Sequence, residues 1–131
     1  MTPVAILAAA DALAGLGRST RVDGWPRVAA VLARHAIEEA LRQYWALREP
    51  GMEHGTWHAQ LLCLTAYLSN RDLARETAAA WSDLSRACHH HPYDLAPTAT
   101  ELRGLLDVAH RFAAEVARQA ASRRSTTSWT E

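Results

Sequence analysis

The chain has 131 residues, 49% of them hydrophobic and 21% charged, so it can bury the core of one globular domain and is not a disordered polymer. Its 14 basic residues are all arginine and balance 14 acidic ones, and this zero net charge argues against a general binder of polyanions. Two cysteines, Cys63 and Cys88, provide no disulfide framework. We therefore expect a single cytoplasmic domain in which any contact with nucleic acid is local.

The first residues, MTPVAILAAADALAGLG, are apolar but carry no basic region and include Asp11. They predict an amphipathic helix from Pro3 to Leu16, ended by Gly15 and Gly17, rather than a signal peptide. Elsewhere, no stretch is long and apolar enough to span a bilayer. We expect no membrane partner.

Abundant alanine, with few β-branched residues in alternation, predicts an all-α chain. Pro26 fits the first turn of a second helix, and Thr98 with Glu101 forms a possible capping box for a fifth. The later helices are expected over residues 26–48, 56–68, 71–89 and 98–121. The predicted fold is thus one helical bundle of about five helices over residues 1–121, with a flexible polar tail over 122–131.

The second predicted helix is apolar on two sides. One side holds Ile37, Leu41 and Tyr44, and the other holds Val28, Val31, Leu32 and His35. A helix with two apolar sides is covered on both. This pattern indicates either a central helix or one that also forms the seam of a homodimer. Glu38, in the same helix, can form a solvated ion-pair ladder with Arg34 and Arg42.

The segment SRACHHHPYDLAP, residues 85–97, holds three consecutive histidines after a cysteine. At about 100° per residue, Arg86 points away from the apolar stripe of the fourth helix, so it is free to reach a phosphate or a partner subunit. Pro92 disfavours helical geometry in the residue before it, which places His91 in a turn beside Arg86. The pattern is compatible with a metal site, a histidine-rich helix end or a catalytic site.

A metal site would use Cys88 and the three histidines, with His54 and His58 as a second pair. Adjacent residues on a helix diverge too much for all of these donors to converge, so we expect no native metal. A helix end rich in imidazole is the simplest structural explanation, since protonated histidine is favoured near the negative end of the helix dipole.

A catalytic site would act on RNA. An arginine can hold a phosphate and stabilise the charge of the pentavalent transition state. A histidine can take the proton from a ribose 2′-hydroxyl, and such chemistry needs neither metal nor cofactor. Because one histidine serves poorly as both base and acid, a homodimer that places two Arg–His pairs across a cleft would be a natural solution.

The order Arg86, four residues, His91, one residue, Tyr93 resembles the R-x4-H-x-Y motif of HEPN domains. The chain is especially similar to the toxin half of HEPN/minimal-nucleotidyltransferase toxin–antitoxin pairs. The segments WSDLSRACHHHPYDLAPTATELRGLLDVAHRF and ARHAIEEALRQYW extend the similarity over residues 25–118. Two other pairs, Arg48 with His54 and Arg103 with His110, have arginine–histidine spacing but no tyrosine.

The resemblance implies a HEPN-like homodimer that acts as a metal-independent endoribonuclease, a toxin or defence enzyme. Arg86 and His91 would be catalytic. The supporting residues would be Glu38, which would orient Arg86, and His89, His90 and Tyr93. The resemblance also permits a nucleotidyltransferase-type antitoxin that modifies Tyr93. The alternative is a catalytically silent module that binds a nucleotide, RNA or a protein, because Ala87 stands where the family usually has a polar residue.

Overall fold

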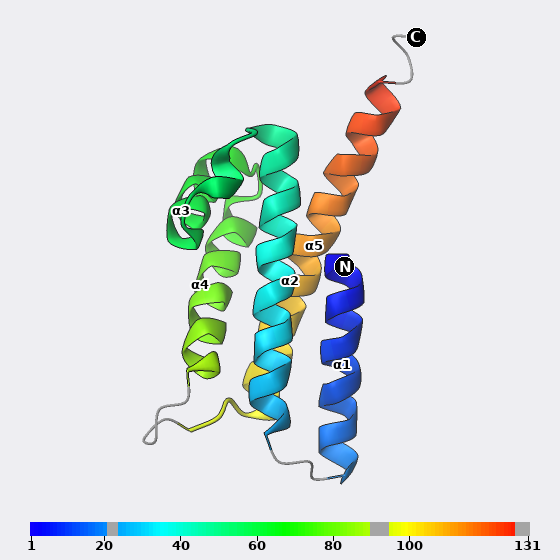
Figure 1. Cartoon of the computed structure of the whole chain (residues 1–131), viewed down its shortest axis with the longest axis vertical. Helices are drawn as coiled ribbons and strands as arrows, with labels where there is room; N and C mark the ends of the chain where they lie inside the picture. Colours follow the sequence, from blue (N-terminus) through cyan, green and yellow to red (C-terminus); the bar gives the residue numbers. More distant parts are fainter. Residues whose placement is uncertain (21–23, 90–94, 128–131) are drawn as a thin grey trace.

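The structure, a computed structural model, describes residues 1–20, 24–89 and 95–127. Over these ranges it contains five α-helices and one 3-10 turn but no β-strand, which confirms the predicted all-helical fold (Figure 1). The elements are α1 (Pro3–Thr20), α2 (Trp25–Arg48), η1 (Met52–His54), α3 (Trp57–Tyr67), α4 (Arg71–Cys88) and α5 (Ala99–Thr127). None of these helices is both long and apolar enough to cross a membrane.

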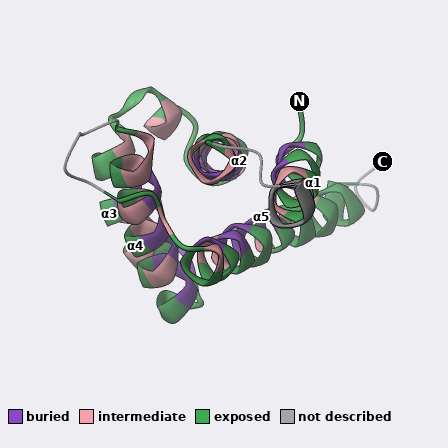
Figure 2. Cartoon of the chain, turned by 90° about the horizontal axis from the view of Figure 1, so that it is seen from below, coloured by how far each residue is buried: buried purple, intermediate pink, exposed green. Residues whose placement is uncertain are grey.

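Helix α2 is the centre of the bundle. It packs against α1, α4 and α5, and the view in Figure 2 shows it between α4 and α1 with α5 along another side. Its buried face is built largely from alanine, together with Ile37, Leu41, Tyr44 and Trp45. Small residues let neighbouring helices approach closely, and the larger side chains fill the space toward the end of α2.

The helix starts follow the signals in the sequence. Thr98 and Glu101 form the predicted capping box, because the Thr98 N–H donates to the Glu101 carboxylate (3.3 Å) and the Glu101 N–H donates to the Thr98 hydroxyl (3.1 Å). Asn70 caps α4 by accepting from the Leu73 N–H at 3.1 Å. Thr56 does the same for α3 at Ala59.

Two helix ends differ from the prediction. Helix α1 continues past Gly15 to Thr20, and α5 continues past Ala121 to Thr127. Gly15 has helical rather than left-handed geometry, so it does not stop the helix. In α5, Ser125 and Thr126 donate their hydroxyls to carbonyls one turn earlier, which satisfies polar groups that would otherwise favour a turn. Both errors arise because single residues with weak helix propensity do not end an established helix.

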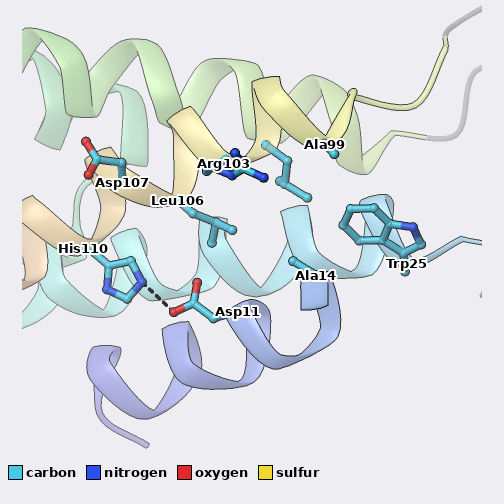
Figure 3. Close-up of a pocket in the computed structure, with 9 residues that line it drawn as sticks. Asp11, Ala14, Trp25, Ala99, Arg103, Leu106, Asp107 and His110 are labelled. Atoms are coloured by element: carbon cyan, nitrogen blue, oxygen red, sulfur yellow. Dashed lines mark hydrogen bonds and ion pairs between the residues drawn. The ribbon is translucent and has the colours of Figure 1, made fainter. Parts of the chain in front are cut away.

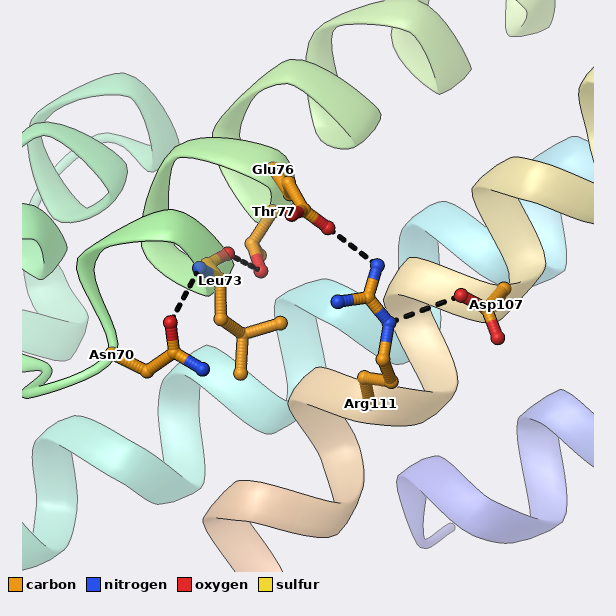
Figure 4. A network of polar contacts seen from close by, with 6 residues as sticks. All are labelled: Asn70, Leu73, Glu76, Thr77, Asp107 and Arg111. Atoms are coloured by element: carbon orange, nitrogen blue, oxygen red, sulfur yellow. Dashed lines mark hydrogen bonds and ion pairs between the residues drawn. The ribbon is translucent and has the colours of Figure 1, made fainter.

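A polar cluster on the surface joins α4 to α5 (Figure 4). Arg111 on α5 pairs with Glu76 on α4 and also donates to Asp107, one turn earlier in its own helix, at 3.0 Å. Next to Glu76 in the chain, the buried Thr77 hydroxyl donates to the Leu73 carbonyl at 2.7 Å. The cluster is exposed, so we expect it to set the register of the two helices more than their stability.

The second apolar side of α2 is not covered within one chain. Val28 is 52% exposed and Val31 is 44% exposed, and His35 is exposed beside them. Leu32 is partly buried against the core. The prediction that α2 is covered on both sides therefore holds for the monomer only on the side of Ile37, Leu41 and Tyr44.

Candidate functional site

The last turn of α4 carries the predicted catalytic arginine. Leu73, Thr77, Ala80 and Leu84 form the buried side of this helix, as the sequence predicts. The Arg86 side chain lies on the outer side and is 77% exposed. Arg86 therefore remains accessible to a phosphate, and the helix ends two residues later with His89 as its C-cap.

Arg86 lies in an open groove of about 570 Å³ between α4 and α5. The groove is also lined by Asp83, Leu95, Pro97, Glu101 and Leu105. The guanidinium of Arg86 pairs with the carboxylate of Asp83, one turn earlier. A ligand phosphate would have to share or displace this carboxylate, and Glu101 adds a second negative charge to the groove.

Arg27, near the start of α2, reaches across to the end of α4. Its Nη1 donates to the Ala87 carbonyl at 3.1 Å and to the His89 carbonyl at 3.3 Å. The last carbonyls of a helix have no partner within it, and they form its negative end. Arg27 satisfies two carbonyls at this end and so fixes the backbone where the histidine run begins. No pattern in the sequence predicts this role, because the two partners lie 60 and 62 residues away from Arg27 in the chain.

Glu38 was expected to orient Arg86, but in the structure it contacts two other residues. It accepts a hydrogen bond from the Trp81 indole at 3.1 Å, and its carboxylate lies 3.9 Å from Arg34 Nε. Arg86 pairs instead with Asp83, a partner that its spacing of three residues on a helix could have suggested. Trp81 thus joins α4 to α2 through Glu38.

Cys88 lies partly buried next to this group. Burial raises the pKa of its thiol, with Arg34 acting to lower it and Glu38 to raise it. At neutral pH the thiol is consequently protonated, which is unfavourable for a nucleophile or a metal ligand.

Of the remaining predicted site residues, the structure describes only His89. His89 is exposed, and its backbone N–H donates to the Arg86 carbonyl at 3.3 Å. His90, His91 and Tyr93 lie outside the described residues. The roles assigned to these three residues therefore stay predictions.

A metal site would require Cys88 and His89 to lie close to His54 and His58. Arg27 and Ala87 meet at one end of the bundle, so α2 and α4 are antiparallel and the segment of η1 and the start of α3 lies at the far end from Cys88 (Figure 1). His54 and His58 belong to that segment and do not form a second pair with Cys88. Within the described ranges, no group of three or more His, Cys, Asp or Glu could hold a metal ion.

A second hollow of about 330 Å³ lies between α1 and α5, away from Arg86 (Figure 3). Leu106, Ala14 and Trp25 give it apolar walls, and His110 contacts Asp11 at one end of it, with Nε2 and Oδ2 2.8 Å apart. This contact joins α1 to α5. It also gives His110 a structural partner on α1.

Comparisons with models of known protein families, with curated proteins and with solved structures found no match to this chain. The fold and the site define a helical bundle with an open groove between α4 and α5. The assignment to the HEPN family depends on the sequence around Arg86 alone, and it remains a proposal.

Proposed function

We propose that the protein is a metal-independent endoribonuclease of HEPN type, a toxin or defence enzyme, in which Arg86 and His91 act on the RNA phosphodiester. The observation that carries the proposal is the position of Arg86. Its guanidinium is exposed in a groove at the end of α4, five positions before His91 in the chain.

In this proposal, His91 takes the proton from a ribose 2′-hydroxyl, and the 2′-oxygen attacks the adjacent phosphorus. The bond from phosphorus to the 5′-oxygen breaks, which leaves a 2′,3′-cyclic phosphate and a 5′-hydroxyl after a proton is delivered to the leaving oxygen. Arg86 offers parallel N–H donors to the phosphate and stabilises the extra charge of the transition state. In the absence of RNA, the Asp83 carboxylate pairs with the Arg86 guanidinium, and the RNA phosphate would replace it.

A homodimer would supply the second histidine as the acid. The exposed side of α2 supports this part of the proposal, because Val28 and Val31 leave an apolar strip uncovered. Arg27, on the same turns of α2, contacts the end of α4 that precedes His91. A dimer formed through this strip would bring two copies of that end near one another.

A second candidate is a catalytically silent module of the same fold that binds a nucleotide, RNA or a protein partner. The acidic surroundings of Arg86 favour it. Asp83 pairs with the guanidinium, Glu101 lines the same groove and Ala87 adds no polar group. In such a module Arg86 would still matter for binding, but no bond would be cleaved.

The test is RNA cleavage in excess EDTA by the wild type and by His91→Ala and Arg86→Ala, with His54→Ala as the matched control. Bulk tRNA and a structured transcript are the substrates, and the mass of each protein is measured in solution. We expect cleavage by a dimeric wild type, about 100-fold slower or undetectable cleavage by the two site variants, and an unchanged control.

Equal activity in wild type and His91→Ala would exclude His91 as the catalytic base. Absence of cleavage by a folded dimer would contradict the enzyme proposal for these substrates. If RNA then binds to the wild type and not to Arg86→Ala, the silent module becomes the better interpretation.

A nucleotidyltransferase-type antitoxin is tested separately. If it adds a nucleotide to Tyr93, the mass of the wild-type protein increases in its presence, and the mass of Tyr93→Phe does not.

A further inference from the structure

Three arginines line a small hollow at the end of the bundle opposite Arg86. This hollow, the arginine pocket, has a volume of about 270 Å³ and lies where the ends of α2 and α3 meet α5. It is lined by Arg48, Arg118, Arg123 and Gln119, together with the hydroxyl-bearing residues Tyr67, Ser69 and Ser122. All seven side chains carry hydrogen-bond donors, and the three arginines carry donors only.

The arginine pocket has a surplus of positive charge. Glu115 is the one carboxylate that pairs with a pocket arginine in the part of the chain that the structure describes, and it accepts from Arg118 Nε at 3.0 Å. Gln119 also donates to Glu115, at 3.0 Å. The pKa of Glu115 is held below its usual range, mainly by the hydrogen bond from Arg118. Glu115 therefore stays ionised and neutralises Arg118, while Arg48 and Arg123 have no carboxylate partner among the described residues.

The negative ends of two helices explain only part of this charge. Arg123 donates to the Leu47 carbonyl in the last turn of α2, and α3 ends at Tyr67. Each helix end corresponds to about half a negative charge, so the two ends together offset about one of the two remaining positive charges. Capping uses one N–H of Arg123, and a guanidinium has five. Among the described residues, a net positive charge and several guanidinium N–H groups without a partner remain at the pocket.

Arg48 is exposed at the end of α2 and lines the arginine pocket. The buried Tyr44 side chain, one turn earlier in α2, has its hydroxyl close to the Arg48 guanidinium. Burial raises the pKa of Tyr44, and Arg48 acts in the opposite direction, so the charge of Arg48 lies near this hydroxyl. Tyr67 packs its ring edge-on against Trp45, with centroids 5.1 Å apart, which fixes another wall.

We propose that the arginine pocket binds a phosphate group. Guanidinium forks and hydroxyl donors around a space of this size match the several acceptor oxygens and the negative charge of phosphate. The site is separate from the Arg86 groove and does not depend on the ribonuclease proposal. Its phosphate could be free or the end group of a nucleotide, since both present the same oxygens.

The experiment is a titration of the full chain with inorganic phosphate, followed by calorimetry and by the change in melting temperature. Sodium chloride at matched ionic strength is the reference. We expect saturable phosphate binding that raises the melting temperature and that chloride does not reproduce. Adenosine monophosphate is titrated in parallel. Tighter binding than phosphate identifies a nucleotide as the source, and equal binding identifies free phosphate.

Arg48→Gln tests the location of the site, because this arginine loses no ion pair with any residue that the structure describes. Arg124→Gln is the matched control, since Arg124 is an exposed neighbour of Arg123 on α5 that does not line the arginine pocket. We expect Arg48→Gln to weaken phosphate binding about tenfold and Arg124→Gln to weaken it less than about twofold. Equal losses in both variants would mean a diffuse charge effect, and no binding by the wild type would remove the site altogether.

Discussion

Arg27 determines the position of the α4 end through two backbone carbonyls. Replacement by glutamine removes the charge and the reach of the guanidinium, so the Ala87 and His89 carbonyls lose their partner. We expect Arg27→Gln to lower the free energy of unfolding by about 1 kcal/mol, as measured by urea denaturation. We also expect faster amide hydrogen exchange near the end of α4.

Arg103→Gln is the control for this change, because Arg103 is exposed on α5. It should leave both the unfolding free energy and the exchange near His89 unchanged. If Arg27→Gln gave the same exchange rates as the wild type, the contact with the helix end would have no role in holding it.

The reactivity of Cys88 reports on Glu38. The raised pKa of this thiol keeps it protonated at neutral pH, so alkylation should become fast only at a higher pH than for a free cysteine. The negative charge of Glu38 disfavours the thiolate, and Glu38→Gln should therefore lower the pKa of Cys88 and shift the alkylation profile to lower pH. The measurement is iodoacetamide labelling against pH in a Cys63→Ser background.

Glu39→Gln is a matched control for the adjacent carboxylate, which pairs with Arg42 instead. Its alkylation profile should follow that of the Cys63→Ser background. A profile that does not move in Glu38→Gln would contradict the position of Glu38 beside Cys88.

At the scale of the element, the length of α1 depends on a glycine in its interior. Gly15 lies in helical geometry, and a Cβ added there meets nothing within 4 Å. We expect Gly15→Ala to raise the free energy of unfolding by about 0.5–1 kcal/mol, because alanine favours helix and loses less backbone entropy. Thermal and urea unfolding measure the change.

Gly51→Ala provides the contrast. Gly51 has a φ of 109° in the turn after α2, where a side chain is strained, so the same substitution should destabilise by about 1 kcal/mol or more. Had α1 ended at Gly15 in a left-handed conformation, both alanine variants would destabilise. The sign of the change at Gly15 therefore decides where α1 ends.

The stability of the whole molecule depends on a core shared by all five helices. Phe112 on α5 is fully buried, and its replacement by alanine should cost about 3–5 kcal/mol, a large part of the total stability of a domain this size. Leu62 on α3 is 67% exposed, and Leu62→Ala should change the stability by less than about 0.5 kcal/mol. Urea denaturation of both variants measures the difference, and similar losses would contradict the position of α5 in the core.

Much of this architecture was readable from local pattern. Leu102, Leu106, Phe112 and Val116 recur at helical spacing in the sequence, and all four are buried on the inner side of α5. The capping residues Thr98 and Glu101 predicted its start, because caps act within one turn of the chain. The exposed position of Arg86 also followed from its angle on α4.

The sequence by itself determined the helical class, the helix starts and the candidate residues around Arg86, since all of these depend on interactions within a few positions of the chain. The tertiary structure alone decided which residues lie near one another at the two ends of the bundle. It brought Arg27 to the end of α4, joined Glu38 to Trp81 rather than to Arg86, and gathered Arg48, Arg118 and Arg123 around one hollow. The physical reason is that the residues brought together lie up to 75 positions apart in the chain. The packing of alanine-rich helices, which no local pattern encodes, sets which of their polar side chains come near one another.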